Sequence, residues 1–141
     1  MRSMKLDAIA LVQETLVQIE PAATAVIFYD RLFTLDPTLR PLFTHDLTLQ
    51  GLRFLAALHV AVGGLSEPEL MVTAVKQLGK RHVAYGVRPE HYHTFGKALF
   101  WTLEQQLGDR WTPAVAAAWT EAYYLLAGLM KEAAQREMVM V

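Results

Sequence analysis

Apolar residues recur every three or four positions along most of this chain, and glycine or proline stands wherever that pattern stops. A helix brings positions three and four apart onto one face, so each such stretch predicts an amphipathic helix with one buried side. No segment shows the strict alternation of apolar and polar residues that is typical of a half-buried strand. The fold is therefore expected to be all-α, with about six or seven helices joined by short loops.

Proline and glycine mark the expected helix boundaries. Pro21, Pro89 and Pro113 suit the first turn of a helix, where a proline loses no helical hydrogen bond. Gly86 and Gly108 suit the position just past a helix end. Further helices are expected over 22–35 and 48–62, with a short turn-like helix over 37–43. The other stripes are Ile9, Val12, Leu16 and Ile19; Met71, Val75, Leu78 and His82, after a Ser66–Glu69 capping box; Tyr92, Phe95 or Gly96, Leu99 and Leu103; and Val115, Trp119, Ala122, Leu126 and Met130.

The composition excludes several classes of function. The chain has no cysteine, which removes disulfides, thiolate metal sites, iron–sulfur clusters and haem attached through cysteine. Its net charge of -1 gives no electrostatic reason to expect nucleic acid or an acidic membrane as partner. No uninterrupted apolar run approaches the roughly 18 residues of a membrane span, and the first residues lack the apolar core of a signal peptide. We expect a single domain, residues 1–141, of a cytoplasmic protein that binds neither nucleic acid nor membranes.

Of the five histidines, only His82 lies on an expected core face. His91 and His93 are two positions apart on a helix, so their rings diverge and both are expected at the surface. His45 falls in a polar loop, and His59 flanks an apolar stripe. At His82, a polar ring is either a core histidine with satisfied hydrogen bonds or a ligand to a buried group. Periodicity by itself leaves both open.

Four segments, in this order, resemble the globins. They are "FTLDPTLRPLF" (33–43), "LGKRHVAYGV" (78–87), "RPEHYHTFGKAL" (88–99) and "AAAWTEAYYLLAGLM" (116–130). The likeness is to the bacterial single-domain globins, among them the Hell's Gate type, to the globin domain of flavohaemoglobins and, more distantly, to neuroglobin. It extends over about residues 5–132. It implies a globin fold, all-α, in which about six to eight helices sandwich a haem.

The resemblance implies which residues hold that haem. His82 becomes the iron ligand, Phe43 stacks on the porphyrin, and Val87 and Phe95 line the proximal side. A five-coordinate haem needs one imidazole from a rigid helix and an open opposite side where a diatomic gas binds. The implied cofactor is haem b, iron protoporphyrin IX.

On the gas side, the resemblance points to Tyr29 and Gln50, with Phe54 and Leu58 one and two turns after Gln50. A hydroxyl and an amide that donate to an O2 ligand would each contribute on the order of 1–2 kcal/mol and favour O2 over CO. The implied function is reversible binding of O2, for oxygen transport or scavenging, at a five-coordinate or water-bound iron, with CO and NO as further ligands. The alternative is a Tyr29 bonded to backbone and a Gln50 exposed near a helix start.

Tyr92 and Glu121 raise an enzymatic alternative. The resemblance to flavohaemoglobins implies a tyrosine ten residues after the haem histidine and a glutamate within "AWTEAY". A carboxylate bonded to the far nitrogen of His82 would give the ring imidazolate character and favour oxygen activation. Nitric oxide dioxygenation, a detoxification, would follow; the chain shows no GxGxxG fingerprint, so it would need a separate reductase. Otherwise Tyr92 is a plain core residue and Glu121 is solvated. A haem-free sensor is a third class, against which His82 and Phe43 argue.

Overall fold

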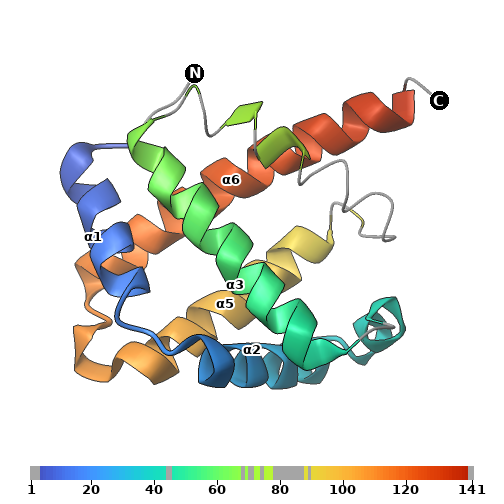
Figure 1. The fold of residues 1–141 in the computed structure, drawn as a ribbon, viewed down its shortest axis with the longest axis horizontal. Helices are drawn as coiled ribbons and strands as arrows, with labels where there is room; N and C mark the ends of the chain where they lie inside the picture. The colour runs from blue at the N-terminus through green and yellow to red at the C-terminus, as the bar shows by residue number, and fades with distance from the viewer. Residues whose placement is uncertain are drawn as a thin grey trace.

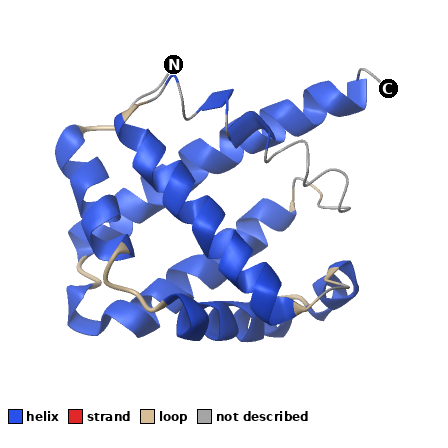
Figure 2. Cartoon of the chain, in the orientation of Figure 1, coloured by secondary structure: helices blue, strands red, loops and turns tan. Residues whose placement is uncertain are grey.

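The computed structural model describes residues 4–43, 46–67, 69, 72–73, 75–77, 88 and 90–139, without the side chains of 134–139. Helices are the only regular secondary structure in these ranges (Figure 2). The α-helices are α1 (Leu6–Leu16), α2 (Pro21–Leu35), α3 (Leu47–Gly63), α5 (His91–Leu107) and α6 (Pro113–Val139), and the 3-10 helices are η1 (Pro37–Leu42), η2 (Gly64–Ser66) and η3 (Gly108–Arg110). The all-α prediction is confirmed.

Local capping explains most of the helix ends that the sequence predicts. The carboxylate of Glu20 accepts hydrogen bonds from two N–H groups in the first turn of α2, at 2.6 and 3.2 Å. Asp36 and Asp46 cap η1 and α3 in the same way, and Thr112 caps α6. These side chains satisfy donors that a helix start leaves without internal partners. The C-terminal end of α5 is at Gly108. Its backbone has a φ of 56°, a conformation that strains glycine less than other residues.

Helix α2 packs against both α3 and α5, while α1 packs against α6. Figure 1 shows α3 running diagonally across the view, with α2 along the lower edge and α6 spanning the molecule. Each helix contributes fully buried side chains to one core. These include Val12 from α1, Leu32 from α2, Leu55 from α3, Leu103 from α5 and Trp119 from α6.

A buried polar contact joins α1 to α6. The indole N–H of Trp119 donates to the hydroxyl of Thr15 at 2.8 Å, and that hydroxyl donates to the Leu11 carbonyl at 2.7 Å. Both polar groups are satisfied in the core, as buried polar groups normally are. Thr15 lies outside the apolar stripe, so the spacing of apolar residues did not reveal it.

Helix α3 is more apolar than the sequence analysis expected. Together with η2 it forms a stretch, Leu47–Ser66, that is long and apolar enough to cross a membrane by length and composition, the one such helix in the described ranges. The search for an uninterrupted run missed it because Gln50, Arg53 and His59 interrupt it. Core helices of soluble proteins meet the same criterion. In this fold, α3 packs on α2 along one of its sides.

Candidate functional site

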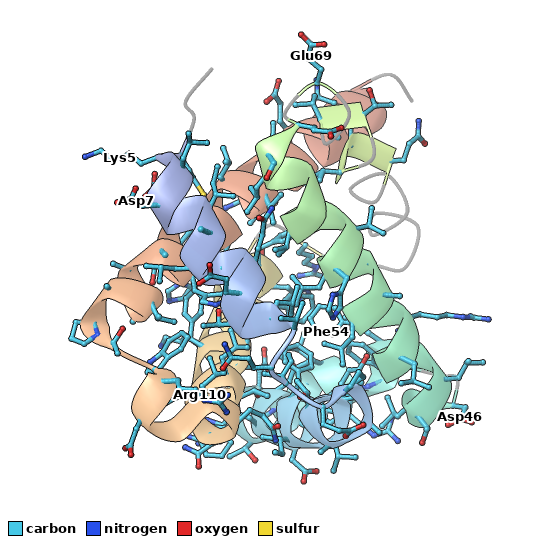
Figure 3. The ribbon with its side chains drawn as sticks, turned by 60° about the vertical axis from the view of Figure 1, so that its left-hand side comes forward. Lys5, Asp7, Asp46, Phe54, Glu69 and Arg110 are labelled. Atoms are coloured by element: carbon cyan, nitrogen blue, oxygen red, sulfur yellow. The ribbon has the colours of Figure 1, made fainter. Side chains whose placement is uncertain are left out.

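An aromatic cluster, formed by Phe28, Tyr29, Phe33, Phe43 and Phe54, joins α2 and α3 to the end of η1. The Tyr29 ring meets Phe28 and Phe43 edge-on, with centroids 5.2 and 5.3 Å apart, and stacks on Phe33 at 5.9 Å. Phe54, which points inward from α3 in Figure 3, stacks on Phe28 at 4.7 Å. These separations lie in the attractive range for aromatic pairs. Tyr29 is therefore held by rings on three sides.

Gly51 lets α3 approach α2 closely at this cluster. A Cβ atom at position 51 would lie 2.5 Å from the Cβ of Ala25 and 3.2 Å from Cε2 of Tyr29. Carbon atoms in van der Waals contact are about 3.5–4.0 Å apart, so no residue with a side chain fits here without a shift. The Tyr29 ring thus packs against the backbone of α3 next to Gln50.

The hydroxyl of Tyr29 is available for a ligand. The residue is 6% exposed, and burial raises the pKa of its hydroxyl to about 12, so it keeps its proton at neutral pH. It has no hydrogen-bond partner among the residues that the structure describes, and the half-buried side chain of Gln50 has none there either. The backbone bond considered as an alternative for Tyr29 is therefore absent from the described contacts. The Tyr29 hydroxyl on α2 and the Gln50 amide on α3 are thus two donors without a partner in the described ranges, on two helices that pack together.

The other expected gas-side residues lie beside this pair. Phe43 and Phe54 are half-buried, and Leu58 is buried. Phe43 contacts the Tyr29 ring directly, Phe54 stacks on the neighbouring Phe28, and Leu58 belongs to the same hydrophobic core. Tyr29, Phe43 and Phe54 thus form an apolar, aromatic seat shared by α2, the end of η1 and α3.

The opposite side of the expected site is described only in part. His82 and Val87 lie outside the described residues, so the haem-ligand assignment stays a prediction. In the same expected stripe, Val75 is fully buried. Phe95 is half-buried, and its ring lies 6.4 Å from that of the buried Tyr92.

The remaining histidines differ from an iron ligand in their surroundings. His59 and His93 are exposed, and His93 shares a hydrogen bond of 3.0 Å with the hydroxyl of Tyr124. His91 accepts a hydrogen bond from the backbone N–H of Arg88 at 3.0 Å. His45 lies outside the described residues. The surface positions expected for His91 and His93 agree with these contacts.

Helix α6 does not bring Glu121 to Tyr92. It is Tyr123 that faces α5: its hydroxyl donates to the backbone carbonyl of Tyr92, and its ring covers Gly96, where a Cβ would lie 2.7 Å from Cε2. Two residues turn a helix by about 200°, so Glu121 points to nearly the opposite side. There it lines a surface hollow beside Met4 and makes no hydrogen bond or ion pair among the described residues. Because His82 lies outside the described residues, a bond between Glu121 and the haem histidine stays a prediction.

Several further residues shape the site that no sequence pattern singled out. Phe33 follows Tyr29 by one helical turn, and this spacing was an available signal. Phe28 and Gly51 left no local signal, because their roles depend on contacts between α2 and α3. Tyr123 was equally hidden, since its partner belongs to another helix.

The comparisons with known proteins agree with this all-α arrangement. The sequence profile of the globin family matches residues 26–130. The chain belongs to the globin family.

Curated relatives include flavohemoproteins of bacteria. That of Xylella fastidiosa is 33% identical over 139 residues, which cover 94% of this chain and 35% of the relative. That of Vibrio cholerae is 31% identical over 126 residues, covering 86% of this chain and 32% of the relative. This chain thus spans about a third of the length of the curated relatives that it matches.

Solved structures show the same fold at low sequence identity. The hexacoordinated heme protein from an anhydrobiotic tardigrade has a TM-score of 0.85 and 14% identity, and the match covers 94% of this chain and 96% of that one. Deoxy hemoglobin from Mustelus griseus has a TM-score of 0.81 and 17% identity, with 93% and 98% covered. At these identities the likeness concerns the fold alone.

Proposed function

We propose that this globin binds haem b and, on it, reversibly binds O2 and other diatomic gases. His82 would ligate the iron, and Phe43 would stack on the porphyrin. Val87 and Phe95 would line the proximal side. When bound, the haem would supply an iron to which a gas molecule can bind. Family membership and the apolar, aromatic seat support this assignment.

The observation that carries the proposal is the hydroxyl of Tyr29. Its ring is buried and it has no hydrogen-bond partner among the described residues, yet its oxygen is not one of the fully enclosed polar atoms there, so it borders space that a ligand or water can occupy. An O2 ligand carries partial negative charge and accepts a hydrogen bond well, whereas CO accepts one poorly. Tyr29 and Gln50 would donate to it, and Phe54 and Leu58 would keep water away. Their role is to orient and retain the gas.

The first test is the optical spectrum of the purified, haem-supplied protein. We expect a strong Soret band in the wild type and its loss or large change in His82→Ala. His59→Ala is the matched control, because that histidine is exposed on α3, and it should keep the wild-type spectrum. A colourless wild-type protein would refute haem binding and leave the haem-free sensor.

The second test is the rate of O2 release. Tyr29→Phe and Gln50→Leu should each speed release by about tenfold, which corresponds to one lost hydrogen bond to a charged acceptor. Tyr124→Phe, which removes the hydroxyl of an exposed tyrosine, should leave the rate unchanged. Wild-type rates in both distal variants would show that the distal assignment is wrong.

Nitric oxide dioxygenation is the second candidate, and the similarity to flavohemoproteins favours it. In this reaction O2, NO and one electron give nitrate, so repeated turnover needs a reductase. We would measure nitrate formation with an NADH-dependent flavin reductase supplied. Because Glu121 does not reach Tyr92, Glu121→Gln should form nitrate at the wild-type rate. Nitrate formation no faster than with free haem would exclude this candidate.

A further inference from the structure

Phe43 directly follows η1, and Arg40 makes hydrogen bonds with both the N–H and the carbonyl of its backbone. The N–H of Phe43 donates to the carbonyl of Arg40 at 3.1 Å, and Nη1 of Arg40 donates back to the carbonyl of Phe43 at 2.9 Å. With φ of -106° and ψ of 82°, Phe43 has left the helix, so its carbonyl lacks a helical partner. The guanidinium supplies one, through a charge-assisted hydrogen bond.

Arg40 also contacts the aromatic cluster directly. Its Cζ lies 5.4 Å from the centroid of the Phe33 ring, within cation–π range. Phe33 in turn meets Phe43 edge-on at 5.4 Å and stacks on Tyr29 at 5.9 Å. Arg40 therefore contacts Phe43 through a hydrogen bond to its backbone carbonyl and Phe33 through a cation–π contact with the face of its ring. These are two of the three rings that enclose Tyr29.

The direction of the Tyr29 hydroxyl depends on those rings. Because the hydroxyl has no hydrogen-bond partner among the described residues, only the packing of its ring orients it there. The side chain of Arg40 makes no ion pair in the same ranges, so its charge has no other use that these contacts reveal. An exposed side chain thus contacts two of the residues whose rings pack on Tyr29.

We propose that Arg40 is a positioning residue: it holds Phe43 and Phe33 against Tyr29 and thereby aims the Tyr29 hydroxyl at the gas ligand. This inference rests on the proposed function, because it assumes that a gas binds beside Tyr29. It adds to that function a residue that touches neither haem nor gas. It also predicts that Arg40 affects O2 more than CO, since Tyr29 acts through a hydrogen bond.

The test compares gas release from haem-loaded variants. Arg40→Met keeps the aliphatic length but removes the donors and the charge, and it should speed O2 release by about fivefold, the equivalent of one net hydrogen bond. CO release should stay near the wild-type rate. In a Tyr29→Phe background, Arg40→Met should add nothing, because the donor that it positions is gone.

Two further variants control for charge and for general loosening. Arg40→Lys keeps a cation over Phe33 but loses the planar guanidinium, so its O2 release should fall between wild type and Arg40→Met. Arg110→Met removes another exposed arginine. This arginine donates hydrogen bonds to the carbonyl of Leu107, the last residue of α5, and to the side chain of Gln18, which follows α1. The variant should release both gases at wild-type rates.

Hydrogen exchange gives a readout that is independent of gas binding. If Arg40 holds Phe43, the peptide covering 36–43 should exchange faster in Arg40→Met, and the peptide covering α1 should not. Since Arg40 is exposed, the variant should fold. If it did not, Arg40→Lys would provide the same comparison.

The outcomes separate the two proposals. A wild type without haem overturns the proposed function. Normal haem uptake, with fast release in Tyr29→Phe but wild-type release in Arg40→Met, overturns only the role of Arg40. Equal acceleration of O2 and CO, or an undiminished effect in the Tyr29→Phe background, also overturns it, because both indicate loosening that does not act through Tyr29.

Discussion

Replacing Gly51 by alanine tests whether close contact of α2 and α3 builds the gas side of the site. The new Cβ would lie 2.5 Å from the Cβ of Ala25, which is attached directly to the α2 backbone. No change of rotamer can relieve this contact. To reach an ordinary separation of at least 3.4 Å, the two helices must move apart by almost 1 Å.

The magnitude follows from two opposing effects. Overpacking a tight site costs about 1–3 kcal/mol. Alanine in place of a helical glycine returns about 0.5–1 kcal/mol. The difference spans about 0–2.5 kcal/mol, so we expect Gly51→Ala to lower the free energy of unfolding by about 1 kcal/mol, which corresponds to roughly 2–4 °C in Tm for a chain of this size. Because Tyr29 lies 3.2 Å from the same Cβ, O2 release should also become faster.

Urea unfolding of the haem-loaded protein, followed by circular dichroism, measures this change. Gly63→Ala is the matched control: it changes the same residue type in the same helix, at an exposed position where a Cβ meets nothing within 4 Å. It should be neutral or stabilising by up to about 1 kcal/mol. Adding Ala25→Gly to Gly51→Ala removes the atom that clashes, so the double variant should lose less stability than the two single losses added together. Strict additivity, or a Gly51→Ala variant as stable as Gly63→Ala, would refute the reasoning.

Three further predictions concern stability. Thr15→Val should cost about 1–3 kcal/mol in urea unfolding, because it leaves the buried indole N–H of Trp119 without a partner, whereas Thr34→Val, at an exposed threonine, should change stability by less than about 0.5 kcal/mol. Tyr123→Phe should cost about 0.5–1.5 kcal/mol and speed hydrogen exchange at the start of α5; unchanged exchange there would contradict its bond to the Tyr92 carbonyl. Burial raises the pKa of Tyr29 and Tyr92 from 10.0 to about 12, so the unfolded chain loses these protons first as the pH rises. The free energy of unfolding should then fall between pH 10 and 12, and fall less in Tyr29→Phe; a flat profile would contradict the raised pKa.

The helices were predictable because their signals are local. A proline at the first position of α2, the caps Asp36 and Thr112, and the glycine after α5 act on residues within one turn of themselves. The apolar stripes needed only the period of a helix. Most of the expected stripe members in α1, α5 and α6 are buried, whereas Met130 is half-buried. The resemblance to globins extended this prediction to the family, which the sequence profile confirmed.

The candidate site was predictable only in its residue types. The sequence singled out Tyr29 and Gln50, but whether their donors are already used depends on every neighbour that folding brings to them. For Glu121, the structure shows that α6 presents Tyr123 to the Tyr92 carbonyl, whereas a bond between Glu121 and His82 stays a prediction, because His82 lies outside the described residues.

By itself, then, the sequence determined the helices, their buried faces and the membership of the globin family. Only the tertiary structure decided that Gly51 meets Ala25 and that Phe54 stacks on Phe28. It also decided that Arg40 contacts Phe43 and Phe33, whose rings pack on Tyr29. Helix formation depends on neighbours within about four positions, which a sequence displays directly. A contact between helices depends on how whole surfaces pack, and no short stretch of sequence contains that information.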